Sequence, residues 1–306
     1  MSLNVKNRFI VLDHLSLIEV QGEDHIEFLQ GQLTQDIKLL THEQAKFAGY
    51  CNLKGRLLAF MLAYRYDNAT HIQIDKSIEE SILKRLKMYV LRSKVSIQSL
   101  SGQFTQIGLI GSEALTKINI DPPQNFLEIT ASHDVIIMRI SKETERYQLI
   151  GKKIDVDVFM KLALSKYKTM SIDEWNNASI LDGTPEIFPG TQESFIPQSL
   201  NMDLIDGINF KKGCYTGQEI VARTHYLGKV KRRMYRVSLE SQDDLTPGDL
   251  ILNEKKEEIG QLVRSAKEDS KKTNALIELR VDQAHETLFI KNHLIQIYSE
   301  DQIKFD

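Results

Sequence analysis

The chain has 306 residues, of which 42% are hydrophobic and 26% charged, with 16 glycines and 6 prolines. This composition is that of a globular protein, and it excludes collagen-like and disordered chains. At roughly 100 to 200 residues per domain, the length predicts two or three domains. Apolar stretches such as 57–64 are far shorter than the roughly 20 residues of a membrane-spanning helix, and the N-terminal segment lacks a secretion signal's apolar region. We therefore expect a cytoplasmic protein.

The number and spacing of cysteines and histidines, and the distribution of charge, exclude further classes of protein. The two cysteines, Cys51 and Cys214, exclude a disulfide framework, and the eight histidines lack metal-ligand spacing, so we expect no stable metal site. The net charge is −3, but it is unevenly distributed. Residues 211–236 hold eight Lys or Arg against one acid, whereas 240–258 hold seven acids against two lysines. This change of sign indicates a change in organisation near residue 236.

The first half of the chain mixes predicted strands with helices. We expect a strand at 14–20, a helix within 22–37, and a hairpin whose strands, 47–51 and 56–65, are joined through Gly55. Ser77 and Glu80 have capping-box spacing for a helix of about four turns. Further strands are expected at 94–98, 106–110, 135–140 and 147–150, before a helix at 156–167. The mixture predicts an α+β fold.

The second half changes character twice. Ser171 and Glu174 have capping-box spacing and predict a helix at Trp175, and residues 182–207 follow as loop. Beyond Arg232, strand-like runs at 233–239, 249–253, 258–266, 274–281 and 287–298 predict a small β barrel or sandwich of about 75 residues. We therefore divide the chain into an α+β region of two subdomains, 1–228, and a C-terminal β-barrel domain, 229–306.

The segment 195–233 carries the candidate chemistry. Thr216 and Glu219 have capping-box spacing, so a helix should begin at Gly217, close behind Cys214. A helix N-terminus and the nearby Lys211, Lys212 and Arg223 favour the thiolate form of a cysteine. These features make Cys214 a candidate reactive thiol; the alternative is a small buried apolar residue.

This segment resembles the signature of the bacterial YgfZ-type folate-binding proteins. The matching residues are Lys212, Gly213, Cys214, Tyr215, Gly217, Gln218 and Glu219, followed by Ala222 and Arg223. The resemblance continues in 20–36, in the hairpin segment 52–56 and in 183–208, and it covers most of the chain.

The resemblance implies the fold of the glycine-cleavage T protein, with three domains in a ring around a central folate channel and a C-terminal small β barrel. It implies tetrahydrofolate or a derivative as the cofactor. Members of the family are implicated in iron-sulfur cluster assembly or repair, and through it in tRNA modification by iron-sulfur enzymes. The implied partners are folate and iron-sulfur client or assembly proteins, with tRNA contacted indirectly. Cys214 would act as a transient ligand to iron or as a nucleophile.

The resemblance also assigns folate contacts to five residues. The family has two folate-associated tryptophans; Trp175 matches one, and Leu15 stands at the place of the other. Gln198, Asn201 and Arg223 are the remaining candidates. Each of these residues has a structural alternative. Trp175 could be an anchor of the core, and the amides of Gln198 and Asn201 could bond to loop backbone. Arg223 could pair with Glu219 one helical turn earlier, unless Glu219 serves only as the capping-box partner of Thr216.

One departure from the T protein separates the candidate functions. The T protein has acidic residues just after its hairpin glycine, where this chain has Arg56 after Gly55. Transfer of a one-carbon unit needs a positioned acid or base, so this departure argues against transferase chemistry. The leading hypothesis is a folate-binding accessory protein. The alternatives are a tetrahydrofolate-dependent one-carbon transferase and a tRNA-binding module that uses the basic residues Lys229, Lys231, Arg232 and Arg233.

Overall fold

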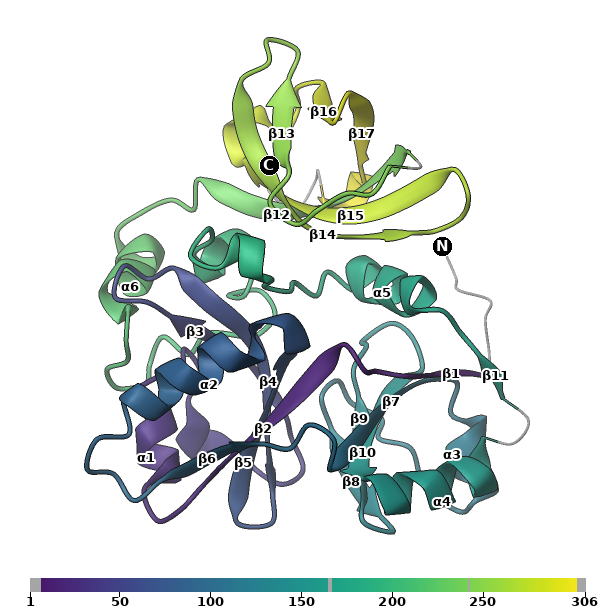
Figure 1. Ribbon diagram of the computed structural model, residues 1–306. Helices are drawn as coiled ribbons and strands as arrows, with labels where there is room; N and C mark the ends of the chain where they lie inside the picture. The colour runs from purple at the N-terminus through teal and green to yellow at the C-terminus, as the bar shows by residue number, and fades with distance from the viewer. Residues whose placement is uncertain (1–6, 165–166, 242, 302–306) are drawn as a thin grey trace. The chain divides into compact units, whose positions relative to one another are not determined.

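The structure, a computed structural model, describes residues 7–164, 167–241 and 243–301 (Figure 1). Its internal contacts divide the chain into two compact units. Unit 1 comprises Met1–Phe28, Ile37–Lys46 and Leu62–Trp175, and unit 2 comprises Leu29–Asp36, Phe47–Met61 and Asn176–Asp306. The chain passes between them several times, and the division at residue 228 remains a prediction.

A six-stranded sheet lies in unit 1, with the order β11-β1-β7-β10-β9-β8. Its strands are β1 (Arg8–Val11), β7 (Phe104–Ile110), β8 (Ile129–Ser132), β9 (Val135–Arg139), β10 (Arg146–Lys152) and β11 (Lys168–Thr169). Helices α3 (Glu113–Lys117) and α4 (Lys153–Ala163) accompany it. The apolar face of α4, with Val156 and Phe159, packs with Ile107 and Leu149 of the sheet in one buried cluster. The helix begins three residues before the predicted range 156–167 and ends four residues before its end; residues 165–166 of that prediction lie outside the described residues.

A five-stranded sheet has the order β3-β4-β5-β2-β6. Its strands are β2 (Leu15–Gln21), β3 (Lys46–Cys51), β4 (Leu57–Tyr66), β5 (Ala69–Asp75) and β6 (Ser96–Ser99), with helices α1 (His25–Gln30) and α2 (Glu79–Met88). The predicted capping box at Ser77 and Glu80 is wrong. The carboxylate of Asp75 instead accepts the Ser77 backbone N–H at 2.9 Å, and a 3-10 turn, Lys76–Ile78, precedes α2.

The C-terminal strands close into a barrel in the order β12-β15-β14-β13-β16-β17 (Figure 1). They are β12 (Arg232–Glu240), β13 (Leu250–Asn253), β14 (Glu258–Lys267), β15 (Lys272–Arg280), β16 (Leu288–Ile290) and β17 (His293–Ile297). Alternate residues such as Tyr235, Val237 and Leu239 point into its apolar interior, as a strand period of two requires. The prediction of a small C-terminal barrel is confirmed.

Between β11 and the barrel lie α5 (Ile172–Leu181), two 3-10 turns (Pro189–Thr191 and Pro197–Leu200) and α6 (Gln218–Tyr226). The predicted capping box of α5 is confirmed: Ser171 N–H donates to the Glu174 carboxylate at 2.7 Å, and Glu174 N–H donates to Ser171 Oγ at 3.2 Å. The predicted α+β class is also confirmed. Within the described ranges, no helix is long and apolar enough to cross a membrane.

Candidate functional site

Helix α6 begins at Gln218, one residue after the predicted start at Gly217, and it is capped differently. Gly217 is the N-cap residue, with a φ of 82°, and no side chain caps the helix. The predicted capping box of Thr216 and Glu219 is therefore wrong. The Thr216 N–H donates instead to the Gly31 carbonyl at 3.2 Å, and the Glu219 side chain is exposed. A left-handed N-cap at glycine needs no side-chain oxygen to bend the chain into the helix.

The hairpin loop 52–55 meets the start of α6. A Cβ atom on Gly217 would lie 2.4 Å from the Asn52 carbonyl oxygen and 2.9 Å from the Gly55 Cα. The loop is rigid in its own right, because the Asn52 Oδ1 accepts the backbone N–H groups of Lys54 at 2.8 Å and Arg56 at 3.0 Å. Two segments singled out in the sequence, 52–56 and 212–219, therefore come together in unit 2.

Lys212 joins a third segment to this site. Its ammonium is buried and donates to the carbonyl oxygens of Gln30, Leu33 and Gln35 at 2.7, 2.6 and 2.9 Å. Gln30 ends helix α1, where the last carbonyls have no partner within the helix. Lys212 also lies over the Tyr215 ring, at 4.9 Å from its centroid. We infer that this lysine fixes the segment that carries Cys214.

The two cysteines differ in accessibility. Cys214 is exposed and Cys51 is buried, so the interpretation of Cys214 as a buried apolar residue is wrong. Burial raises the pKa of the Cys51 thiol to about 12. Burial, and secondarily the nearby Cys51, also raises the pKa of Tyr215. Cys214 is thus the thiol of this site that a reagent or partner can reach.

The two predicted amide contacts bond to backbone. Gln198 is fully buried and donates to the Val221 carbonyl at 2.6 Å, while its own Oε1 has no hydrogen-bond partner among the described atoms. Asn201 donates to the Met234 carbonyl of β12 at 2.7 Å. Asn201 also has a φ of 58°, a conformation that asparagine tolerates better than most residues. Their contact with folate remains a prediction, and the unpartnered Oε1 of Gln198 is buried, so a ligand could reach it only if the surrounding side chains moved.

Trp175 and Leu15 share one cluster in unit 1. Trp175 is 4% exposed and packs with Leu12, Ile110 and Met170, against which Leu15 also lies. The guanidinium of Arg146 lies 4.5 Å from the Trp175 ring, a cation–π contact. The structure thus brings the two predicted folate positions together, but the indole is covered. Stacking of a folate ring on it remains a prediction and would require the cluster to open.

The basic residues of 223–233 have different partners. Arg233 makes a two-pronged ion pair with Asp203, at 2.6 and 2.9 Å, and Arg232 pairs with Glu278 at 2.6 Å. Burial raises the pKa of Glu278, although Arg232 opposes the shift. In the described part of the chain, Arg223 has no ion pair, so the predicted pairing with Glu219 is not formed. Arg223 is therefore available to an anionic ligand.

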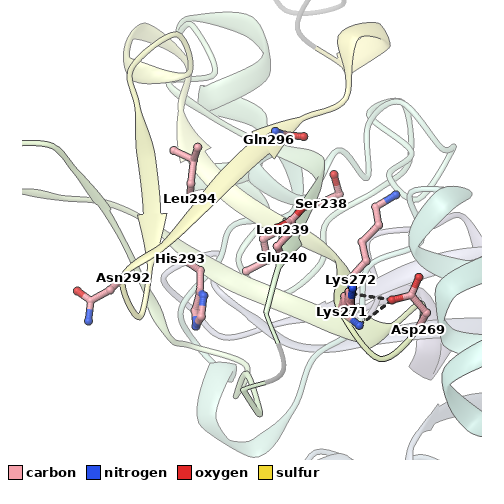
Figure 2. A pocket seen from close by; sticks show the side chains of 10 residues that line it. All are labelled: Ser238, Leu239, Glu240, Asp269, Lys271, Lys272, Asn292, His293, Leu294 and Gln296. Atoms are coloured by element: carbon pink, nitrogen blue, oxygen red, sulfur yellow. Dashed lines mark hydrogen bonds between the residues drawn. The ribbon is translucent and has the colours of Figure 1, made fainter.

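Among the described residues, the position of the T-protein acids and the cavity on the barrel contain no candidate reactive group. Arg56, at the position of the T-protein acids, donates from Nη1 to the Ser194 carbonyl. A cavity of about 660 Å³ on the barrel is lined by charges of both signs and contains none of the predicted site residues (Figure 2). There, the Asp269 carboxylate accepts the backbone N–H groups of Lys271 and Lys272. Across residues 7–164, 167–241 and 243–301, no three His, Cys, Asp or Glu side chains gather as a metal site.

Sequence comparison finds relatives named tRNA-modifying protein YgfZ. The protein from Blochmanniella pennsylvanica is 32% identical over 235 residues, covering 75% of this chain and 71% of the relative. That from Colwellia psychrerythraea is 33% identical over 247 residues, covering 79% and 75%. That from Buchnera aphidicola is 32% identical over 265 residues, covering 84% and 81%. No family model matches the chain.

Structure comparison confirms the predicted T-protein fold. The glycine cleavage system aminomethyltransferase T from Bartonella henselae matches with a TM-score of 0.75, over 96% of this chain and 86% of that chain. The two sequences are 13% identical, so the likeness establishes the fold alone.

Proposed function

The chain belongs to the YgfZ family, and we propose that it is a folate-binding accessory protein that supports the assembly or repair of iron-sulfur enzymes and, through them, tRNA modification. The name of its relatives, tRNA-modifying protein, supports the link to tRNA. The T-protein fold supports folate as the cofactor, because the T protein uses tetrahydrofolate. The iron-sulfur link comes from the family resemblance.

The observation that carries the proposal is an exposed thiol on a fixed segment. Cys214 lies between Lys212, whose ammonium binds three carbonyls, and Gly217, which is packed against the hairpin loop. An immobilised and accessible thiol loses little conformational entropy when it meets a partner. The chain has two cysteines, fewer than the four thiolates that a cluster normally takes. Cys214 therefore suits transient contact with iron or with an adduct, and not cluster storage.

The test is complementation in cells that lack the native protein. Cys214→Ala should leave the protein folded and folate binding intact, while thiomethylated tRNA falls to the level of the deletion strain. The control is Cys51→Ala, which removes the buried thiol. This variant should support thiomethylation of tRNA in proportion to the amount of folded protein in the cells. Normal thiomethylation with Cys214→Ala would exclude the assigned role of this thiol.

The folate site can be tested separately. Arg223 offers an exposed guanidinium without an ion pair among the described residues, which suits the glutamate carboxylates of folate. When bound, tetrahydrofolate would supply a one-carbon carrier. Isothermal calorimetry should give saturable one-to-one binding, weakened by Arg223→Ala. Absence of binding by the parent protein would remove folate from the proposal.

A further inference from the structure

A basic cleft lies beside helix α6 in unit 2, with a volume of about 490 Å³. Its cationic lining comes from the hairpin, the helix, the connection to the barrel and the first barrel strand: Arg56, Arg223, Lys229, Lys231 and Arg232. One acid, Glu278, stands against these five cations. The barrel cavity, by contrast, mixes both signs. The charge of the α6 cleft therefore selects for anions.

Part of this positive charge is not neutralised by the protein. Arg232 is paired with Glu278, which is 4% exposed and already engaged. Arg223, Lys229 and Lys231 are exposed, and none of them has an ion pair with a residue in the described ranges. Lys231 is also close enough to Asp282 to help Arg280 lower the pKa of that carboxyl, so Arg223 and Lys229 are the least compensated cations of the cleft. Exposed cations without an ion-pair partner are typical of a surface that binds an extended anion.

An aromatic cluster of Phe210, His225 and Tyr226 includes a neighbour of Arg223, one of the residues that line the cleft. The rings of Phe210 and His225 stack with centroids 3.7 Å apart and planes inclined by 10°. Tyr226 packs edge-on against both rings, and its hydroxyl donates to the Phe210 carbonyl at 3.3 Å. Tyr226 is nevertheless 63% exposed, and it follows Arg223 by three residues on α6, so the two side chains are neighbours. An exposed aromatic ring is thus held in place beside Arg223, next to the residues that line the cleft but not among them.

We propose that this surface, the α6 cleft with its aromatic cluster, binds single-stranded RNA directly. Lys229 and Lys231 would contact successive phosphates, and Tyr226 would stack with an unpaired base, whereas Arg223 is kept for the folate tail. An acidic peptide or a polyglutamate chain would use the cations but has no group that needs the exposed ring. Paired RNA keeps its bases stacked within the helix. The choice of RNA rests on the proposed role in tRNA modification. From the sequence, direct binding of tRNA through these basic residues was an alternative to indirect contact, and the structure adds the cleft, the single strand and the aromatic ring.

The test measures RNA binding alone. The full-length protein is titrated against a fluorescein-labelled single-stranded RNA of about 12 nucleotides, and anisotropy is followed from about 50 to 200 mM salt. We expect saturable binding that weakens steeply with salt. Lys229→Ala with Lys231→Ala should lower the slope of log affinity against log salt by about 1.4, since each lost phosphate contact accounts for about 0.7. The matched control is Lys84→Ala with Lys87→Ala, which removes two exposed lysines of α2 and should bind as the parent does.

The aromatic contribution has its own variant. Tyr226→Ala should weaken RNA binding about tenfold, and Tyr226→Phe should restore most of it, because stacking needs the ring and not the hydroxyl. Unchanged affinity in the double lysine variant or in Tyr226→Ala would overturn the inference. So would a glutamate peptide or an RNA duplex that binds as tightly as the single strand. Such results would leave the Cys214 complementation unaffected, so the two proposals can fail separately.

Discussion

Gly217 and Gly55 lie back to back, so close that a Cβ on Gly217 would stand 2.9 Å from the Gly55 Cα. Both have positive φ, 82° and 67°, so each needs glycine for its backbone conformation as well as for space. This contact joins the start of α6 to the hairpin loop. It explains why two segments some 160 residues apart both depend on glycine. It also holds the residues just after Cys214 against the hairpin loop.

Gly217→Ala should therefore destabilise the protein by at least about 2 kcal/mol, since it combines an unfavourable φ with a clash against backbone. The matched control is Gly213→Ala in the same motif. A Cβ on Gly213 meets no atom within 4 Å, so we expect a change below about 1 kcal/mol. Urea unfolding of both variants decides the matter, and equal stabilities would contradict the packing described for Gly217.

Lys212 should be worth more to stability than its exposed neighbour. Lys212→Met removes the ammonium and leaves the carbonyls of Gln30, Leu33 and Gln35 without their donor, which we expect to cost about 2 to 4 kcal/mol. Lys211→Met, next along the chain, removes an exposed ammonium and should change the free energy of unfolding by less than about 0.5 kcal/mol. A small effect of Lys212→Met in denaturant unfolding would show that the three carbonyls are solvated without it.

The sequence predicts most elements of the fold, because apolar periodicity and turn residues act locally. The barrel strands, α4 and the start of α6 all follow from such patterns. Capping is less predictable, because several residues near a helix start can satisfy the same N–H groups. Ser171 and Glu174 form the expected box, whereas Asp75 replaces Ser77 and Gly217 replaces Thr216. In the last case, the distant hairpin loop decides the outcome.

The candidate site is less accessible to sequence reasoning. The motif identifies Lys212 and Cys214, but the nearness of Lys212 in sequence suggests that it acts on the thiol. Its ammonium instead binds carbonyls of a segment some 180 residues earlier. Phe210 and His225 also escape prediction, because their stacking depends on how the loop before α6 folds back on the helix. The run of Lys and Arg in 211–236 was the sequence feature that marked this surface.

The indole of Trp175 should be sensitive to the strand beneath it. A Cβ on Gly108 of β7 would lie 2.5 Å from Cζ3 of Trp175, so Gly108→Ala should destabilise the protein by about 1 to 3 kcal/mol. Trp175→Leu would remove the clashing atoms. We therefore expect Gly108→Ala to cost less in a Trp175→Leu background, and a double-mutant cycle measured by urea unfolding would show this coupling. Additive effects would contradict the contact.

His71 should make stability depend on pH. It is 2% exposed, and burial lowers its pKa below the usual 6.5, against the opposing effect of Glu19, whose Oε2 lies 3.4 Å away. As the pH falls below about 6.5, the unfolded chain takes up a proton that the folded protein resists, so stability is lost. The slope from this group can reach about 1.4 kcal/mol per pH unit.

Replacing His71 tests this linkage. His71→Gln should be less stable at neutral pH but should lose less stability between about pH 7 and pH 5 than the parent does. The control is His42→Gln, because His42 is exposed and its ring is solvated in both states. The measurement is the free energy of unfolding from urea titrations across this range. An unchanged slope in His71→Gln would place the acid-sensitive group elsewhere.

The exposed position of Cys214 makes a prediction that needs no assay of function. Native protein treated with a disulfide reagent at about pH 8 should release one equivalent of chromophore quickly, from Cys214, because the buried Cys51 thiol, with its pKa raised to about 12, is both covered and protonated. Unfolded protein should release two. Cys214→Ser should abolish the rapid phase and Cys51→Ser should preserve it. Rapid modification of both thiols in the native protein would mean that the hairpin strands open around Cys51, and that the contact between Gly55 and Gly217 does not hold the segment as described.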